Sequence, residues 1–379
     1  MNRANYLGFV SCGALGSSLM HTAVFRELRR AFPDSNIGIA SDRRGVELFR
    51  HNPYGIKVFD VMGPAAQLDR DFFETLVRIK QEDYNTALVF SLSEPYYMRV
   101  SQYLGGFEHR VGQNGGDTVI LNNYYDRFLN TPGYEQKFLE KFGFTDAAAA
   151  ASDSYFGRYN LSFLEPLGVK AEELSCRPEI WSSADDREAV ESHFRELGVQ
   201  EEDLLAGVNI GGRQGNNLWN TDNYSELIKG MFSESGGLVR GRALKVMINY
   251  AAHEMYTFTD IIRSLPRTLP VYGVPKNMST GQLAEAVGRC NFFISTDTGA
   301  AHVAQARKVP SLVLYPDEPM RKRWMCPDAQ VLPLTGKGHV NDIAVNKALL
   351  ASLNAILQWA VLGSNQRAPA CEAGILPLN

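Results

Sequence analysis

The sequence predicts an α/β protein with two domains, each built on a parallel sheet that carries helices on both faces. Short apolar runs alternate with helical patterns along most of the chain, which is typical of consecutive strand–helix–strand units. The chain has 379 residues, and a single hydrophobic core rarely extends beyond about 250–300 residues. Two cores are therefore expected.

The first domain is predicted to span residues 1–180. Its first strand is the apolar run Tyr6–Cys12, and apolar residues then recur at helical spacing from Leu19 to Ala31. The same signals predict strands at Ile37–Ala40, Lys57–Val61, Thr86–Phe90 and Arg110–Gly112, and a helix at Phe72–Gln81.

The second domain is predicted over residues 181–340, after a connection at Arg177–Trp181. Strands are expected at Leu205–Ile210, Leu244–Tyr250, Phe292–Ser295 and Pro310–Tyr315, and helices at Ala184–Leu197, Tyr224–Phe232, Tyr256–Ser264 and Gly299–Lys308. An apolar C-terminal helix at residues 341–363 and a polar tail at residues 364–379 follow. Because open parallel sheets bind ligands at the carboxyl ends of their strands, we expect the ligand site in the cleft between the domains.

Composition excludes several classes of protein. Lysine and arginine number 38 against 42 aspartates and glutamates, so the net charge of −4 gives no general basic field for nucleic acid. No apolar run reaches the roughly 20 residues of a membrane-spanning helix, and we expect a cytoplasmic protein. The five cysteines are scattered without a C-x-x-C pair, which argues against a disulfide framework or a zinc site.

The strongest chemical signal is the segment Asn291–Pro316. A buried strand there ends in Asp297-Thr298-Gly299, and a helix of small residues begins at once. The first backbone N–H groups of a helix have no partner within it and lie at the positive end of its dipole, so they bind anions. The segment therefore predicts an anion-binding site at Gly299–Ala301. Asp297 is also suited to be the helix N-cap, and the two roles can coexist.

This D-S/T-G-x-x-H loop resembles the signature of glycosyltransferase family 9, the ADP-heptose:lipopolysaccharide heptosyltransferases. Further matching segments along the chain are Gly16, Phe32-Pro33-Asp34, His51-Asn52-Pro53-Tyr54, Arg110-Val111-Gly112, Gly207–Trp219 and Val274–Ser279. The resemblance implies a GT-B architecture, in which two Rossmann-like domains face a cleft. The N-terminal domain would hold the acceptor and the C-terminal domain the nucleotide-sugar donor.

The resemblance also implies the chemistry. A sugar, expected to be heptose, would be transferred from an ADP-linked donor to a lipopolysaccharide-type or other cell-envelope glycan. The transfer would proceed with inversion and without a metal or other cofactor. Such an acceptor is compatible with peripheral contact at the inner face of the membrane. Donor contacts would fall on Asp297, Thr298, Gly299, Ala300 and Ala301, on Met278 near the base and on Glu254 near the ribose. The alternatives are a core position for Met278 and a solvated helix charge for Glu254.

Two positions depart from the family pattern. Ser17 stands where family members usually carry the aspartate that deprotonates the acceptor, and a positioned base typically contributes about 10²–10⁴ in rate. Asn217 stands where a lysine would neutralise donor phosphate, and Arg213 is a candidate to replace it. His21, one helical turn after Ser17, and Glu94, in a loop after a strand, are candidate bases. Packing of His21 and a plain loop position for Glu94 are the alternatives.

The predicted function is therefore that of a heptosyltransferase-like glycosyltransferase. Ser17 and Asn217 raise the alternative of a protein with the same fold that binds nucleotide or glycan without transfer. A nucleotide-sugar epimerase is a third possible function.

Asp69-Arg70-Asp71 matches a metal-binding D-x-D motif, but it precedes a helix. Stabilisation of the helix dipole by acidic residues explains these aspartates better than metal binding does. The basic run Arg321-Lys322-Arg323 is expected to be a solvated face, with contact to donor phosphate or an anionic acceptor as the alternative.

Overall fold

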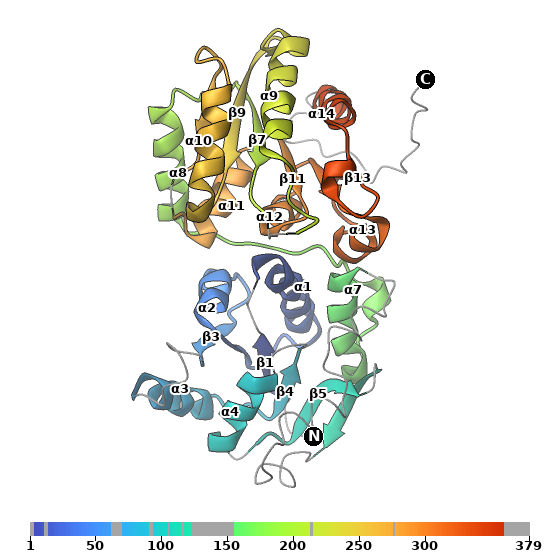
Figure 1. Ribbon diagram of the computed structural model, residues 1–379. Helices are drawn as coiled ribbons and strands as arrows, with labels where there is room; N and C mark the ends of the chain where they lie inside the picture. Colours follow the sequence, from blue (N-terminus) through green and yellow to red (C-terminus); the bar gives the residue numbers. More distant parts are fainter. Residues whose placement is uncertain are drawn as a thin grey trace. The chain divides into compact units, whose positions relative to one another are not determined.

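The computed structural model describes residues 4–10, 14–61, 70–90, 94–104, 106–114, 117–122, 155–212, 215–275 and 277–359 (Figure 1). The chain divides into two compact units, Met1–Trp181 and Ser182–Asn379. Each unit contains a mainly parallel sheet with helices on both faces, which confirms the predicted fold class.

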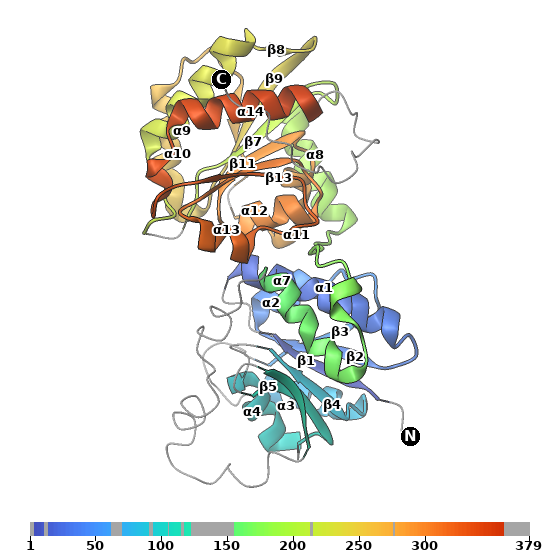
Figure 2. The ribbon, with the colours of Figure 1, turned by 90° about the vertical axis from the view of Figure 1, so that its right-hand side faces the viewer.

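The strands of the first unit are β1 (Tyr6–Val10), β2 (Ile37–Ser41), β3 (Lys57–Asp60), β4 (Thr86–Val89), β5 (His109–Asn114) and β6 (Asp117–Asn122). Its helices are α1 (Leu15–Ala31), α2 (Arg43–Phe49), α3 (Arg70–Gln81), α4 (Glu94–Leu104) and α7 (Phe156–Leu161), with 3₁₀ turns η2 (Ser162–Leu167) and η3 (Ala171–Glu173). The sheet order is β3-β2-β1-β4-β5-β6, and among the described strands of this unit only the β5–β6 pair is antiparallel. Helices α1, α2 and α7 lie on one face, and α3 and α4 on the other (Figure 2).

The strands of the second unit are β7 (Leu204–Asn209), β8 (Leu238–Val239), β9 (Arg242–Asn249), β10 (Val271–Gly273), β11 (Phe292–Thr296), β12 (Ser311–Tyr315) and β13 (Val331–Thr335). Its helices are α8 (Ala184–Glu196), α9 (Thr221–Ser235), α10 (Met255–Ser264), α11 (Thr280–Gly288), α12 (Gly299–Ala306), α13 (Glu318–Trp324) and α14 (Val345–Trp359), with 3₁₀ turns η4 (Ala252–Glu254) and η5 (Val340–Asp342). The parallel path is β10-β9-β7-β11-β12-β13, and β8 pairs antiparallel with β9. Helices α9, α10 and α14 cover one face, and α8, α11 and α12 the other (Figure 2).

Strand order reverses in the middle of both sheets. The reversal lies between β1 and β4 in the first unit and between β7 and β11 in the second. The loops that follow these strands run to opposite faces of the sheet, and the crevice between them is where ligands of doubly wound sheets bind. The central strands β1, β4, β7 and β11 are buried along their whole length, because helices cover both faces.

The end of the first unit is anchored by a buried arginine. The Arg26 guanidinium donates to the carbonyl of Arg177 at 3.0 Å and pairs with Glu179 at 3.0 Å. Glu179 also accepts a hydrogen bond from the Tyr54 hydroxyl at 2.5 Å. These contacts fasten the segment before Ser182 to the first unit, so the chain leaves that unit directly after Trp181.

Two predicted elements need correction. Glu94 does not lie in a loop but is the first residue of α4, where a carboxylate favours the helix dipole; its side chain lies outside what the structure describes. The C-terminal helix does not begin at residue 341 but at Val345, because the preceding residues form η5. The Asp342 carboxylate holds that turn by accepting the backbone N–H groups of Lys337 and His339. Residues 360–379, with the predicted end of the helix and the tail, lie outside the described residues.

Candidate functional site

Three loops meet at the switch point of the second sheet. They follow β7, β9 and β11, which are neighbouring parallel strands. The candidates Asn217, Glu254 and Asp297 each come from a different one of these loops, and side chain–backbone hydrogen bonds of Glu254 and Asn217 join the three loops. The fold therefore gathers at one edge of the sheet residues that are up to 80 positions apart in sequence.

The start of α12 presents the anion-binding geometry that the motif predicts. Thr298 is the N-cap residue, with φ −142° and ψ 172°, and its side chain does not cap the helix. The capping role considered for Asp297 is therefore wrong, because Asp297 stands one residue earlier. The backbone N–H groups of Gly299, Ala300 and Ala301 receive no side-chain cap, and the helix dipole places partial positive charge there.

The Asp297 carboxylate faces a histidine from the same motif. His302 Nε2 lies 3.4 Å from Asp297 Oδ1, and the two side chains are only 4% and 6% exposed. The imidazole also packs on the ring of Trp324 at a centroid distance of 5.9 Å. When protonated, His302 offsets the negative charge that would otherwise oppose a phosphate at the start of α12. His302 was not among the candidate residues, although the last position of the D-S/T-G-x-x-H pattern signals it.

Glu254 holds the loop after β7 in place. One carboxylate oxygen accepts the backbone N–H of Gly212 at 3.2 Å, and the other accepts that of Ala251 at 2.6 Å. A Cβ atom at Gly211 would lie 2.5 Å from both oxygens, so only glycine fits beside the carboxylate. Glu254 belongs to the turn η4 and its side chain is 14% exposed, so it is not a solvated helix charge. Its contact with ribose stays a prediction.

Asn217 links the two loops nearest to α12. Its Nδ2 donates to the backbone carbonyl of Asp297. Its Oδ1 is buried and has no hydrogen-bond partner among the described residues.

Met278 is half-buried and directly precedes Ser279, the N-cap of α11. Arg213, the candidate replacement for a phosphate-binding lysine, lies outside the described residues.

Two of the candidates of the first unit, Ser17 and His21, lie on α1, next to the switch point of its sheet. Ser17 is half-buried and its hydroxyl donates to the carbonyl of Ala14 at 3.1 Å. His21 is 3% exposed and packs edge-on against Phe90 at 4.8 Å and Phe156 at 6.4 Å. Burial lowers the pKa of His21 to about 4. This environment supports the packing alternative, because a base with so low a pKa accepts a proton poorly near neutral pH.

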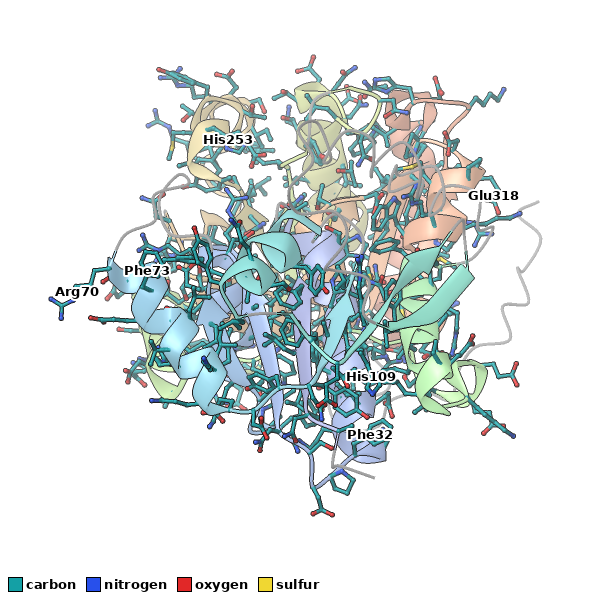
Figure 3. The ribbon with its side chains drawn as sticks, turned by 90° about the horizontal axis from the view of Figure 1, so that it is seen from below. Phe32, Arg70, Phe73, His109, His253 and Glu318 are labelled. Atoms are coloured by element: carbon teal, nitrogen blue, oxygen red, sulfur yellow. The ribbon has the colours of Figure 1, made fainter. Side chains whose placement is uncertain are left out.

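The remaining sequence motifs take ordinary structural positions. Asp71 lies in the first turn of α3, and the exposed Arg70 at the start of that helix (Figure 3) pairs with Glu74 one turn later at 2.6 Å. Asp69 lies outside the described residues. In α13, Arg321 pairs with Glu318, and the Arg323 guanidinium lies 5.3 Å from the ring of Trp324. Within the described chain, no helix combines the length and apolar character needed to cross a membrane.

Two Rossmann-like units, the second with an uncapped helix start at its switch point, have the architecture of the GT-B fold. Residues 159–331 match the model of glycosyltransferase family 9 (heptosyltransferase), so the chain is similar to the heptosyltransferase-like enzymes of this family. Lipopolysaccharide heptosyltransferase 3 of Escherichia coli strain K12 is 21% identical over 318 residues, which are 79% of this chain and 79% of the relative.

Solved structures share the fold over nearly the whole chain. The glycosyl transferase family 9 protein of Veillonella parvula DSM 2008 superposes with a TM-score of 0.72 and 17% identity, covering 94% of this chain and 98% of that one. E. coli ADP-heptose lps heptosyltransferase II gives a TM-score of 0.66 at 17% identity, with 94% and 99% covered. E. coli heptosyltransferase WaaC with ADP gives 0.62 at 13% identity, with 93% and 99% covered.

Proposed function

We propose that the protein transfers heptose from an ADP-linked donor to a hydroxyl group of a lipopolysaccharide-type or related cell-envelope glycan. The observation that carries the proposal is the uncapped start of α12 at the switch point of the second sheet. The similar heptosyltransferase WaaC was solved with ADP, and the curated relative acts on lipopolysaccharide by its name. A lipid-linked acceptor would bring the protein to the inner face of the membrane as a peripheral protein.

The donor site would work through backbone groups. In the transition state, negative charge builds up on the departing diphosphate, and the N–H groups of Gly299, Ala300 and Ala301 are already oriented to receive it. The three loops contain two carboxylates, Asp297 and Glu254. Asp297 faces His302, and both oxygens of Glu254 accept backbone N–H groups. Both oxygens of Glu254 are therefore already engaged, which argues against Glu254 as a nucleophile that attacks the sugar.

Proline at the first position of α12 tests the backbone site. Thr298 has the extended conformation that a residue before proline prefers, and proline is tolerated at the first helical position. Gly299→Pro therefore removes one N–H group while the helix remains. A charge-assisted hydrogen bond contributes about 1.5–3 kcal/mol, so the Kd for ADP is expected to rise about 10- to 150-fold.

Titration calorimetry with ADP, GDP and UDP measures this effect. Gly299→Ala is the matched control, because it adds a side-chain carbon but keeps the N–H group. ADP should bind the parent most tightly, and Gly299→Pro should lose much more affinity than Gly299→Ala. A folded Gly299→Pro protein that binds ADP like the parent would contradict the proposed donor site.

A binding function without transfer is the second candidate. It is favoured by Ser17, which cannot act as a base near neutral pH, and by the buried, neutral environment of His21. Ser17→Asp distinguishes the two functions in an assay of transfer from ADP-heptose to a lipopolysaccharide-core acceptor. Turnover that appears only in Ser17→Asp would establish the binding function for the parent. Equal turnover in both proteins would place the base at another residue.

A further inference from the structure

A series of buried side-chain hydrogen bonds lies directly beneath the proposed donor loops. Asn249 Nδ2 donates to Asn209 Oδ1 at 2.6 Å. Asn209 Nδ2 in turn lies 3.0 Å from the carbonyl oxygen of Gly211, 3.2 Å from Ser295 Oγ and 3.2 Å from Thr298 Oγ1. Asn209, Asn249 and Ser295 are 4%, 7% and 1% exposed. Burying so many polar groups is costly unless all of them are paired, so their arrangement needs an explanation.

The orientation of every group in this series follows from counting protons. The Gly211 carbonyl can only accept, so Asn209 must present its NH₂ group there and its oxygen to Asn249. Ser295 Oγ lies 2.6 Å from the carbonyl of Thr296 and gives its single proton to it. The 3.0 Å contact between Ser295 and Thr298 then requires the Thr298 hydroxyl as donor.

The hydrogen bonds therefore run in one direction, from Asn249 through Asn209 and Thr298 to Ser295. Thr298 has no hydroxyl proton left for a phosphate, and its side chain does not cap α12 either. Its hydroxyl instead fixes the position of its own backbone, from which Gly299 and the following N–H groups project. Through Gly211, the same Asn209 amide also fixes the loop that carries Asn217.

We propose that Asn209 and Asn249 are positioning residues of the nucleotide site. They hold the start of α12 and the loop after β7 in the conformation that binds the donor diphosphate, although neither side chain needs to touch it. The inference rests on the proposed function of α12. Loops that are ordered before binding do not lose conformational freedom when the ligand arrives, so disrupting the series should weaken nucleotide binding even where the ligand contacts remain.

Asn209→Asp tests the proposal, because it replaces the NH₂ group by an oxygen of nearly the same size. The new oxygen faces the Gly211 carbonyl, which can only accept, so at pH 8 the Kd for ADP is expected to rise at least tenfold. A buried carboxyl group facing acceptors has a raised pKa. Once protonated it donates one hydrogen bond again, so lowering the pH to 5.5 should restore much of the affinity of this variant.

Asn291→Asp is the matched control at the opposite edge of the same sheet. Asn291 Oδ1 accepts the backbone N–H of Leu205 at 2.8 Å, which a carboxylate does equally well. Its affinity should therefore match the parent at both pH values. The other titratable groups near the series, Glu254, Asp297, His302 and Tyr224, are common to all three proteins, so the pH response that they share is subtracted.

The outcomes separate the positioning role from the proposed function. Three results would overturn the positioning role. The first is a folded Asn209→Asp protein that binds ADP at pH 8 as tightly as the parent, and the second is an equal loss of ADP affinity in Asn291→Asp. The third is an ADP affinity of Asn209→Asp that does not recover at pH 5.5. If Asn209→Asp does not fold, Thr298→Val decides, with a tenfold loss at both pH values expected and an unchanged Kd overturning the proposal. A parent that binds no nucleotide contradicts the proposed function instead. In that case hydrogen exchange of residues 297–302 tests the positioning role. Only faster exchange in Asn209→Asp than in Asn291→Asp supports that role.

Discussion

His21 provides a direct test of whether the first unit carries a base or a packed core at this position. Its imidazole is 3% exposed between Phe90 and Phe156. Burial lowers its pKa from 6.5 to about 4, against the opposing effect of the nearby backbone of Ser17 and Ser18. His21→Leu removes the titratable group and keeps a side chain of comparable volume.

The expected change in stability follows from the two pKa values. In the unfolded chain the histidine has its ordinary pKa of 6.5, and in the native state about 4, so the unfolded state binds more protons at acidic pH. The native state therefore loses stability as the pH falls from 6.5 toward 4. At about 1.36 kcal/mol per pKa unit, the loss is about 2 kcal/mol between pH 7 and pH 5 and about 3 kcal/mol in full.

Hydrogen exchange within α1, corrected for the intrinsic effect of pH, measures this loss in the first unit alone, because two domains need not unfold together. The free energy of opening should fall by about 2 kcal/mol more in the parent than in His21→Leu between pH 7 and pH 5. His51→Gln, which changes an exposed histidine of the same unit, is the control and should respond like the parent.

Two results would refute this account of His21. An equal acid response of the parent and His21→Leu would show that the imidazole is not held neutral by burial. A loss of turnover of about 10² or more in a folded His21→Leu protein would establish His21 as the base after all.

Two further substitutions test contacts of the second unit. Glu254→Gln replaces one acceptor oxygen by an NH₂ group that faces the N–H of Gly212 or Ala251. The free energy of unfolding, measured by urea denaturation, should fall by about 1–3 kcal/mol. An unchanged free energy of unfolding would show that these hydrogen bonds are not needed for stability. His302→Phe leaves the buried Asp297 carboxylate without its partner and should cost about 3 kcal/mol, whereas His302→Gln, which keeps an N–H donor, should cost less. Equal losses in the two His302 variants would show that the imidazole acts only by filling space.

The fold was largely predictable because its strands are buried on both faces. Such strands are continuous apolar runs, and β1, β4, β7 and β11 all lie within one or two residues of the predicted ranges. Short amphipathic helices gave weaker signals. Helix α4 begins in a segment rich in serine and tyrosine that resembles a loop, and α11 is only nine residues long. The antiparallel strand β6 has no apolar alternation strong enough to distinguish it from a turn.

The site was predictable only where its geometry is local. The start of α12 is made by residues adjacent in sequence, so Thr298 and Gly299 could be read from the motif. The contacts of Glu254 and Asn209 connect residues about 40 positions apart, and no local sequence pattern predicts these contacts. A signal nevertheless exists, because both β7 and β9 are apolar strands that end in asparagine. A buried amide is retained only where its hydrogen bonds are satisfied, and the last residue of a strand beside the switch point faces the ligand loops. A polar residue in that position is therefore a candidate for positioning those loops, even when it is too deep to touch a ligand.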